Sequence, residues 1–482
     1  MIAESMAVLV LWPLVAACLL FLLPGRLAWL AVLGGLLPLP VAMWPLTVGV
    51  LEQGVLRLAI ADFQAPLGIV WQLDGLALVL LWLNMLVILL VGAYAAGSYR
   101  ASEPVGRRFW ALWLLLASAM NALLLSADLF NLFVTLELVT LAAIGLLVVD
   151  RKPAALRAAV RYLLLALLGS LFYLLGVALV YGQTGVLDLA LAGAALDDDV
   201  LARTALALMT VGLLIKAAIF PLHGWLPAAH GNAPGPVSAI LSAMVVKVSI
   251  YLIWRLWFWM GLDWDTGIVM TLLGLLGAGA IVYGSVMALV QPRLKMIVAY
   301  STVAQLGYLM LLFPLAGALA FQAASYHLLS HGLAKAAMFL AAANLLARLG
   351  TDRLESLGGA DRHAPIDVFT LALAGVSILG LPPSGGFIAK WMMLDVALAQ
   401  QGWLWVMVIL AGGLLAAGYL FKVLNKACAR PVACELVIDI NPMQRLMSAI
   451  GLLLALAALA AGFVSAPILE VLGQAWPLAA SS

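Results

Sequence analysis

The stretch Leu213–Arg255, LLIKAAIFPLHGWLPAAHGNAPGPVSAILSAMVVKVSIYLIWR, decides the fold of this chain. It holds two apolar runs of helix length, and each run carries one lysine, Lys216 or Lys247. Between them lies a segment rich in proline and glycine, which cannot continue as a regular helix. A lysine in membrane hydrocarbon costs roughly 3 kcal/mol or more. We therefore interpret the two lysines, placed beside a broken helix, as functional residues.

The composition of the chain indicates a polytopic membrane protein. Of the 482 residues, 66% are hydrophobic and 10% are charged, with a mean hydropathy of +1.16; an average soluble domain is about 25% charged. The net charge of +2 does not favour nucleic acid as a partner. Cys428 and Cys434 share a polar loop without histidine, and no phosphate-binding, flavin or haem motif occurs, so we expect neither metal nor cofactor.

Runs of about 20 apolar residues predict an all-α polytopic membrane protein with about 14 transmembrane helices. The first run follows no basic residue, so we interpret it as a span and not as a cleaved signal. The predicted spans lie near residues 6–23, 28–50, 75–96, 109–126, 129–149, 158–181, 202–220, 237–259, 267–290, 296–314, 318–347, 366–399, 403–424 and 446–466.

Basic residues predict the orientation of the chain, because loops on the inside carry an excess of Lys and Arg. With the N-terminus outside, most loop Lys and Arg residues fall inside, as in 100–108 and 151–161. The acidic run Asp197–Asp199 then falls outside. We expect an integral protein of a bacterial inner membrane with both termini outside.

A second break occurs in the span 364–400, where GLPPSGG at 380–386 precedes Lys390. Such a break survives at membrane depth only when it is buried in protein or lines a wet cavity. The broken spans are the seventh and the twelfth, so they run in opposite directions, which is typical of inverted repeats. We predict four segments: an N-terminal three-helix segment 1–108, a first five-helix repeat 109–259 (spans 4–8), a second inverted repeat 267–425 (spans 9–13), and 426–482 with an inside loop and a C-terminal helix.

Two segments outside the spans have possible structure of their own. Residues 52–74 alternate weakly between apolar and polar positions, which is compatible with a short hairpin on the outer surface. The polar loop 426–445 is either a docking surface for a partner or a solvated connector.

Glu137 is the one acidic residue in a long apolar run, and it is interpreted as a partner of Lys216. A nearby carboxylate favours the charged form of a lysine, whereas burial favours the neutral form, so a moving carboxylate would switch proton binding. A static ion pair that joins two helices is the alternative. Lysine suits proton transfer in the membrane because, unlike arginine, it can release its proton when desolvated.

His327, His331 and Lys335 are spaced i, i+4 and i+8, so they form one stripe on a helix. Imidazole accepts and donates protons near neutral pH, and the stripe therefore predicts a proton relay. The same positions could bind zinc, but no acidic or thiol residue accompanies them. His327 on its own is equally compatible with a structural role.

Lys390 follows the second break and is interpreted as the group through which protons leave. Asp395, one turn later, is either its partner or a charge at a helix end. His223 is a candidate relay between Lys216 and Lys247. Among the remaining polar residues, His230 is expected in a loop, Lys295 as an anchor at the membrane interface, and Ser301, Gln305 and Ser325 as ligands of water.

With these residues in place, the chain resembles the antiporter-like L, M and N subunits of complex I and the subunits of Mrp-type cation/proton antiporters, especially their D-type subunit. The resemblance spans residues 110–400. It implies fourteen core helices, breaks in the seventh and twelfth, a Glu–Lys pair, a central lysine and an exit lysine or glutamate. The motifs are Glu137 in its apolar helix, LLIKAAIFPLHGWLPAAH (213–230), SAMVVKVSIY (242–251), PRLKMIVAYSTVAQLGY (292–308), HLLSHGLAKAAMFL (327–340) and GLPPSGGFIAKWM (380–392).

The sequence therefore predicts a proton-translocating subunit of a multisubunit complex, with other membrane subunits as partners and protons, with Na⁺ or K⁺, as transported ions. The D-type subunit of an Mrp-type antiporter is the first expectation. A subunit of an NADH-quinone oxidoreductase, a membrane-bound hydrogenase or a bicarbonate-accumulating complex is the alternative. A membrane scaffold that conducts no protons and a stand-alone solute carrier are alternatives of other classes.

Overall fold

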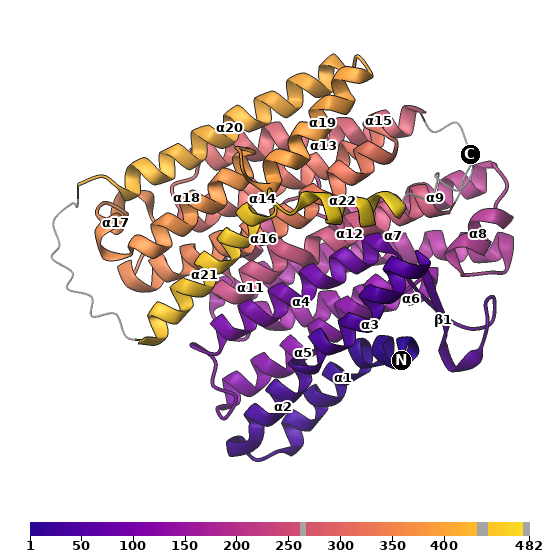
Figure 1. Ribbon diagram of the computed structural model, residues 1–482, viewed down its shortest axis with the longest axis horizontal. Coiled ribbons are helices and arrows are strands. Elements are labelled where there is room, and N and C mark those ends of the chain that lie inside the picture. Colours follow the sequence, from indigo (N-terminus) through magenta and orange to yellow (C-terminus); the bar gives the residue numbers. More distant parts are fainter. Residues whose placement is uncertain (261–266, 431–441, 476–482) are drawn as a thin grey trace.

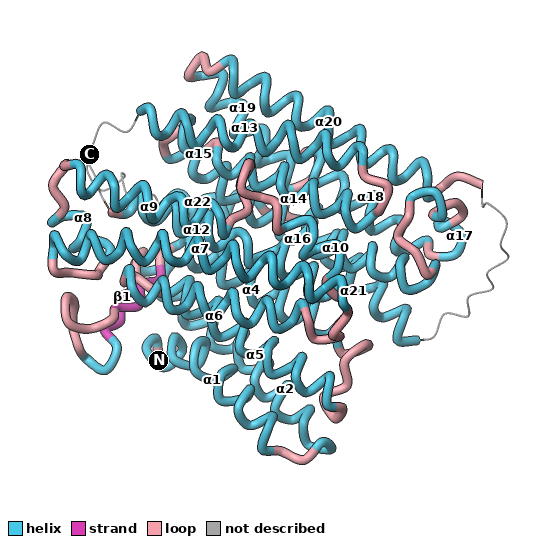
Figure 2. The backbone as a smooth tube through the Cα atoms, turned by 180° about the vertical axis from the view of Figure 1, so that it is seen from behind, coloured by secondary structure: helices cyan, strands magenta, loops and turns pink. Residues whose placement is uncertain are grey.

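The structure is a computed structural model that describes residues 1–260, 267–430 and 442–475. The described residues lie mostly in helices packed side by side, and the strands among them form one small hairpin at the edge of the bundle (Figures 1 and 2). The predicted all-α class is confirmed. The segments 261–266, 431–441 and 476–482 lie outside the described residues, and with them most of the polar loop 426–445 and the C-terminal end.

The N-terminal part contains the predicted hairpin. Strands β1 (Leu56–Ala59) and β2 (Val70–Leu73) pair antiparallel, with Leu56 opposite Leu73. The carboxylate of Asp74 then accepts a hydrogen bond from the amide of Ala77 at 3.0 Å and so caps the next helix. The helices of this part are α1 (Ile2–Leu22), α2 (Ala28–Leu36), α3 (Pro38–Gln53) and α4 (Gly75–Ala95).

The next part contains the first break and the central helix of the bundle. Residues 235–259 form one continuous helical segment that is buried along its whole length, and π-helical turns interrupt it twice. The elements are α5 (Pro104–Leu125), α6 (Leu129–Leu147), α7 (Pro153–Thr184), α8 (Leu189–Ala195), α9 (Val200–Lys216), α10 (Leu226–Asn232), α11 (Gly235–Ile240), η3 (Leu241–Val245), α12 (Val246–Trp254) and η4 (Arg255–Trp259).

The remaining described part surrounds α16, a long helix that is buried for most of its length. The elements are α13 (Gly267–Val290), α14 (Leu294–Met310), α15 (Leu312–Leu315), α16 (Ala318–Leu349), α17 (Ala360–His363), α18 (Pro365–Leu379), α19 (Gly385–Ala399), α20 (Trp403–Ala427), α21 (Pro442–Ala460) and α22 (Ser465–Gln474).

Twelve helical segments in the described residues are long and apolar enough to cross a membrane. They correspond to twelve of the predicted spans. The other two predicted spans are the broken ones: α9 has 17 residues, and α18 and α19 have 15 residues each. The breaks therefore shorten these helices below the length of a regular span.

Both breaks have local causes in the sequence. Helix α9 ends at Lys216, and Pro227 at the start of α10 suits a helix N-terminus because it needs no amide partner there. Helix α18 ends at Leu379, and the next residue, Gly380, has a positive φ of 80°. The hydroxyl of Ser384 then accepts a hydrogen bond from the amide of Phe387 at 3.2 Å and caps α19.

The C-terminal helices pack on the second break. The turn between α21 and α22 lies so close to it that a Cβ atom on Gly462 would collide with the carbonyl oxygen of Pro383. The hydroxyl of Tyr326 on α16 donates to the carbonyl of Ala461 in the same turn. Helix α22 was not predicted, because the sequence placed the last helix at 446–466.

Helices α7 and α9 cross with their backbones in close contact. A Cβ atom on Gly169 would lie 2.6 Å from the carbonyl oxygen of Gly212 and 3.2 Å from Cγ of Lys216. A Cβ atom on Gly212 would in turn collide with the carbonyl oxygen of Gly169. The position of Lys216 therefore depends on small residues at this crossing.

The substitution Gly169→Ala should destabilise the protein by about 1–3 kcal/mol, because the new methyl group forces α7 and α9 apart. The measurement is the thermal unfolding of the purified protein in mild detergent. Gly182→Ala on the same helix is the matched control, since a Cβ atom there meets no heavy atom within 4 Å. Equal stability of the two variants would contradict the role given to this crossing.

Candidate functional site

Glu137 and Lys216 form a buried ion pair. Nζ of Lys216 lies 2.5 Å from Oε1 of Glu137, and the two side chains are 3% and 18% exposed. Nζ also donates to the hydroxyl of Thr140 at 3.3 Å, and the hydroxyl of Ser170 donates to Glu137. The pair joins α6 to the last residue of α9, where the helix dipole favours a positive charge. The predicted proximity of the two residues is confirmed.

Lys247 lies at the centre of the bundle, just after the end of the π-helical turn η3. Its side chain is buried, and Nζ donates to the carbonyl oxygen of Ala243 at 2.9 Å. That carbonyl belongs to the π-helical turn, and such turns are frequent at functional sites. The contact described for the ammonium is thus a neutral oxygen, not a carboxylate.

The predicted stripe lies on α16. The rings of His327 and His331 are 5.7 Å apart and nearly parallel, and all three side chains of the stripe are buried. Nζ of Lys335 donates to the carbonyl of Val298 at 3.0 Å and to the hydroxyl of Ser301. The stripe therefore connects α16 with α14.

The described contacts connect the lysines to the stripe through neighbouring residues. Nζ of Lys390 lies over the ring of Tyr308, which is 5.3 Å from the ring of His327, and His327 stacks on His331. The carbonyl of Ala243, which accepts from Lys247, lies beside α16, where a Cβ atom on Gly332 would be 3.3 Å from it. Lys335 follows His331 by one turn on the same helix.

Lys390 lies against the second break. Its Nζ donates to the carbonyl of Ile378 at 2.7 Å and to that of Leu379 at 3.4 Å, at the end of α18. It also lies 4.5 Å from the ring centre of Tyr308. Asp395 is exposed on α19, whereas Lys390 is buried, so the structure favours the interpretation of Asp395 as a surface charge.

His223 lies in the first break, but its described contacts are aromatic. Its ring is 5.7 Å from that of Phe220 and 4.9 Å from that of Tyr283, which belongs to α13. No described contact links it to Lys216 or Lys247. Its relay role stays a prediction.

Two expectations were wrong. His230 is not a loop residue: it lies fully buried in α10, and its ring is 4.7 Å from that of Phe339. Lys295 is not an interface anchor, because it is buried and donates to the carbonyl of Ala233 at 2.6 Å. The proline at 227 signalled the helix start that places His230 inside.

Several buried polar atoms around the stripe have no hydrogen-bond partner within the described residues. Buried polar groups normally have partners, including ordered water. The expectation that Gln305 and Ser325 bind water is compatible with this arrangement. The residues concerned are His230, Gln305, Ser325, His327, His331 and Tyr419.

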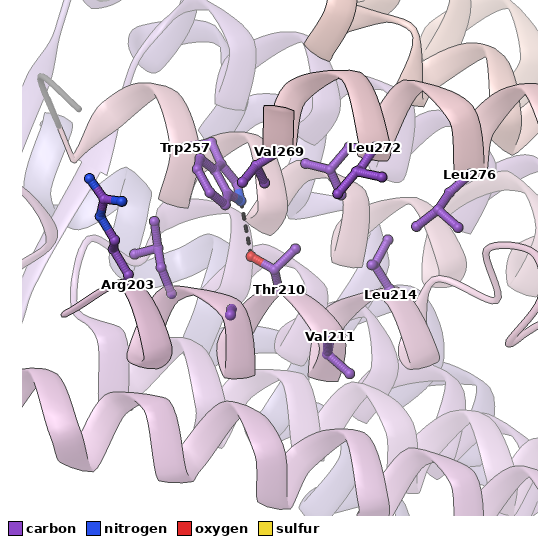
Figure 3. A pocket seen from close by; sticks show the side chains of 11 residues that line it. Arg203, Thr210, Val211, Leu214, Trp257, Val269, Leu272 and Leu276 are labelled. Atoms are coloured by element: carbon purple, nitrogen blue, oxygen red, sulfur yellow. Dashed lines mark hydrogen bonds between the residues drawn. The ribbon is translucent and has the colours of Figure 1, made fainter. Parts of the chain in front are cut away.

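The described residues outside the stripe also include an apolar cavity and two free thiols. No group of three or more potential metal ligands occurs in the described residues. A cavity of about 290 Å³ between α9, η4 and α13 is lined mostly by apolar side chains (Figure 3). Its polar contact is the hydrogen bond from the indole of Trp257 to the hydroxyl of Thr210, at 2.9 Å. Cys18 and Cys428 are exposed free thiols, and Cys434 lies outside the described residues.

The sequence of this chain is similar to those of known membrane subunits. Residues 126–416 match the family described as NADH:quinone oxidoreductase/Mrp antiporter, TM. The N subunit of the NADH-quinone oxidoreductase of Desulforudis audaxviator is 35% identical, over 77% of this chain and 75% of the relative. The D-type subunit of the Na⁺/H⁺ antiporter of Alkalihalophilus pseudofirmus is 30% identical, over 78% and 77%.

Solved structures give the same result. Chains of the Mrp complex from Dietzia sp. and of an archaeal membrane-bound sulfane sulfur reductase each align with a TM-score of 0.88 and 25% identity, over 98% of this chain and 97% or 96% of theirs. A chain of respiratory complex I from Thermus thermophilus aligns with a TM-score of 0.77 and 28% identity, over 98% and 99%. The chain therefore belongs to the NADH:quinone oxidoreductase/Mrp antiporter family, as a multi-pass integral membrane protein with the fold of the antiporter-like subunits of multisubunit complexes.

Proposed function

We propose that this subunit moves protons across the membrane along its buried lysines. Protons enter from the inside near the first break and reach Lys247 by way of Lys216. They pass to Lys335 through His331 and leave by Lys390. The observation that carries the proposal is the row of contacts from Lys390 through Tyr308 and His327 to His331, with the acceptor of Lys247 packed against the same helix, because a relay needs titratable groups near one another.

Glu137 acts as the switch of this pathway. Its carboxylate holds the ammonium of Lys216 at 2.5 Å, and Ser170 holds the carboxylate in turn. When Glu137 moves away, the charged form of Lys216 loses its counterion in a low-dielectric environment and favours passing its proton on. His223, His327 and the buried His230 serve as additional relay groups.

The two breaks also support the predicted organisation. We propose fourteen spans, twelve regular and two broken, arranged as the inverted repeats 109–259 and 267–425 between the segments 1–108 and 426–482. The support is that α9 and the pair α18–α19 are both interrupted, and that each carries a buried lysine beside its break. Both termini lie outside, in a bacterial inner membrane.

For the complex as a whole, we propose a monovalent cation/proton antiporter in which this chain is the D-type subunit. The relative from Alkalihalophilus and the high TM-score with the Mrp complex support this choice. A redox-driven complex is the second candidate, and the 35% identity to the N subunit of an NADH-quinone oxidoreductase supports it. Proton flux that needs Na⁺ or K⁺ distinguishes the first candidate, and flux that needs an electron donor distinguishes the second.

The substitution Lys247→Met in the native complex should lower driven proton flux by roughly a hundredfold or more, the scale that positioned proton-transfer groups contribute. Methionine has a side chain of similar length but lacks the amine that binds and releases the proton. The measurement is acidification or alkalinisation of vesicles that carry the whole complex, normalised to the amount of assembled complex.

The matched control is Lys422→Met. Lys422 is a partly buried lysine on α20 that donates to the carbonyl of Leu289 at 2.5 Å and lies outside the proposed pathway. It should leave the flux within a factor of about two, since partly exposed cations contribute little. If Lys247→Met assembles and conducts like the wild type, the chain is a scaffold and the proton pathway is disproved.

Glu137→Gln keeps the size of the side chain and its contact with Ser170 but removes the charge that Lys216 faces. We expect flux to fall at least tenfold while assembly is retained. Without the carboxylate, Lys216 favours its neutral form and no longer holds a proton to pass on. The decisive measurement is a double-mutant cycle with Lys216→Met. If the pair works as one switch, the double variant should lose no more proton flux than Lys216→Met alone. Losses of flux that add independently would indicate a static ion pair.

A further inference from the structure

A second buried ion pair, between Asp74 and Arg255, takes no part in the proposed pathway. The guanidinium binds the carboxylate with two hydrogen bonds, NH1 to Oδ2 at 2.5 Å and NH2 to Oδ1 at 2.8 Å. The side chains are 2% and 7% exposed. Oδ1 also accepts the capping hydrogen bond from Ala77. Both carboxylate oxygens are therefore occupied.

Arg255 lies on the same face of its helix as the central lysine. Lys247, Tyr251 and Arg255 are spaced i, i+4 and i+8, and residues with this spacing are neighbours on successive turns. The guanidinium carbon lies 4.8 Å from the ring centre of Tyr251 and 4.5 Å from that of Trp259. The hydroxyl of Tyr251 donates to the carbonyl of Leu124 at 3.1 Å. The ion pair thus stands two turns from Lys247.

A small cavity reaches this ion pair from the hairpin end of the molecule. Its volume is about 60 Å³, which is enough for a few water molecules. Arg57, which is half exposed, and Gln72 of β2 line one side, and Tyr251, Arg255 and Trp259 line the other. The cavity on the hairpin side therefore ends at Arg255, two helical turns from Lys247.

The chemistry of the pair makes it a barrier and not a path. The arginine guanidinium does not release its proton in proteins, so it cannot pass one on. Its fixed positive charge also repels protons, as arginines do in channels that exclude them. Asp74 cannot easily accept a proton, because Arg255 and Ala77 occupy both of its oxygens.

We infer that the Asp74–Arg255 pair is an electrostatic barrier that separates Lys247 from the water of the hairpin-side cavity. The inference rests on the proposed function of Lys247. It explains why protons that reach Lys247 continue laterally to Lys335 and do not return to the surface through the first half of the chain. Arg255 and Asp74 are positioning residues in this sense, since they direct the proton without carrying it.

The test is passive proton leak in vesicles that carry the native complex, with a pH gradient imposed and without any driving ion or electron donor. Asp74→Asn combined with Arg255→Gln removes both charges and keeps two amides that can hydrogen-bond to each other. We expect the leak to rise at least tenfold over wild type. Adding Lys247→Met should return the leak to the wild-type level, because the leak passes through that lysine.

The matched control is a second buried Arg–Asp pair. Arg348 and Asp367 lie 3.3 Å apart with side chains 5% and 1% exposed, and they join α16 to α18. Asp367→Asn with Arg348→Gln should leave the membrane tight. An equal leak in this control would show that loosened packing is the cause and would overturn the inference.

Other outcomes are equally decisive. Tight vesicles with the assembled Asp74→Asn, Arg255→Gln variant overturn the barrier, and so does a leak that persists with Lys247→Met. Asp74→Asn alone keeps the positive charge of Arg255, so vesicles with this variant should remain tight to protons. A proton leak in them also overturns the barrier. If the double variant does not assemble, Asp74→Asn with Arg255→Lys provides the second comparison: a buried lysine without its carboxylate can release a proton, so this variant should show a Lys247-dependent leak, and tight vesicles would overturn the barrier. Driven flux of Lys247→Met in the same vesicles tests the proposed function separately.

Discussion

The structure depends on how a buried ammonium finds hydrogen-bond acceptors inside a membrane. Lys247 donates to the carbonyl of Ala243, Lys335 to that of Val298 and Lys390 to that of Ile378. In a regular helix these oxygens would already be bound to the amide four residues later. The end of α18 leaves such an oxygen for Lys390, and the π-helical turn η3 contains the acceptor of Lys247. The acceptor of Lys335 lies within the regular helix α14, where its carbonyl also accepts from the hydroxyl of Ser301. Irregular backbone therefore helps to hold two of the three lysines.

The buried lysines have few acidic partners among the described contacts, and this limits how many of them can be protonated at the same time. Glu137 is bound to Lys216, whereas the contacts described for Lys247, Lys335 and Lys390 are neutral oxygens. Cations repel each other more strongly in a low-dielectric interior than in water. In the proposed pathway, a proton on one lysine would therefore discourage a proton on the next. Such repulsion would give the proposed pathway an order of events without any large movement of helices.

The sequence predicts those parts of the fold that depend on local pattern. Long apolar runs locate the regular spans, the clusters of Pro and Gly locate both breaks, and weak alternation locates the hairpin. The positions of Lys247 and Lys390 beside the stripe on α16 depend on helix packing, and no local pattern encodes them. The pair of Asp74 and Arg255 was missed for the same reason, since its members are 181 positions apart and each looks like an ordinary charge at a helix end. His230 was misplaced because the glycines and prolines that follow it outweighed the helix start at Pro227.

The C-terminal turn at Gly462 gives the second break a mechanical connection to the edge of the subunit. Its backbone packs directly on Pro383, and Pro383 lies between the carbonyls that hold Lys390 and the cap of α19. A displacement of α21 or α22 cannot leave this loop unchanged, because there is no space between the two backbones to absorb it. A neighbouring subunit that pulls on the last helices would therefore alter the acceptors of Lys390 without touching any titratable residue. If Lys390 releases protons as proposed, the C-terminal helices would let assembly itself tune that release.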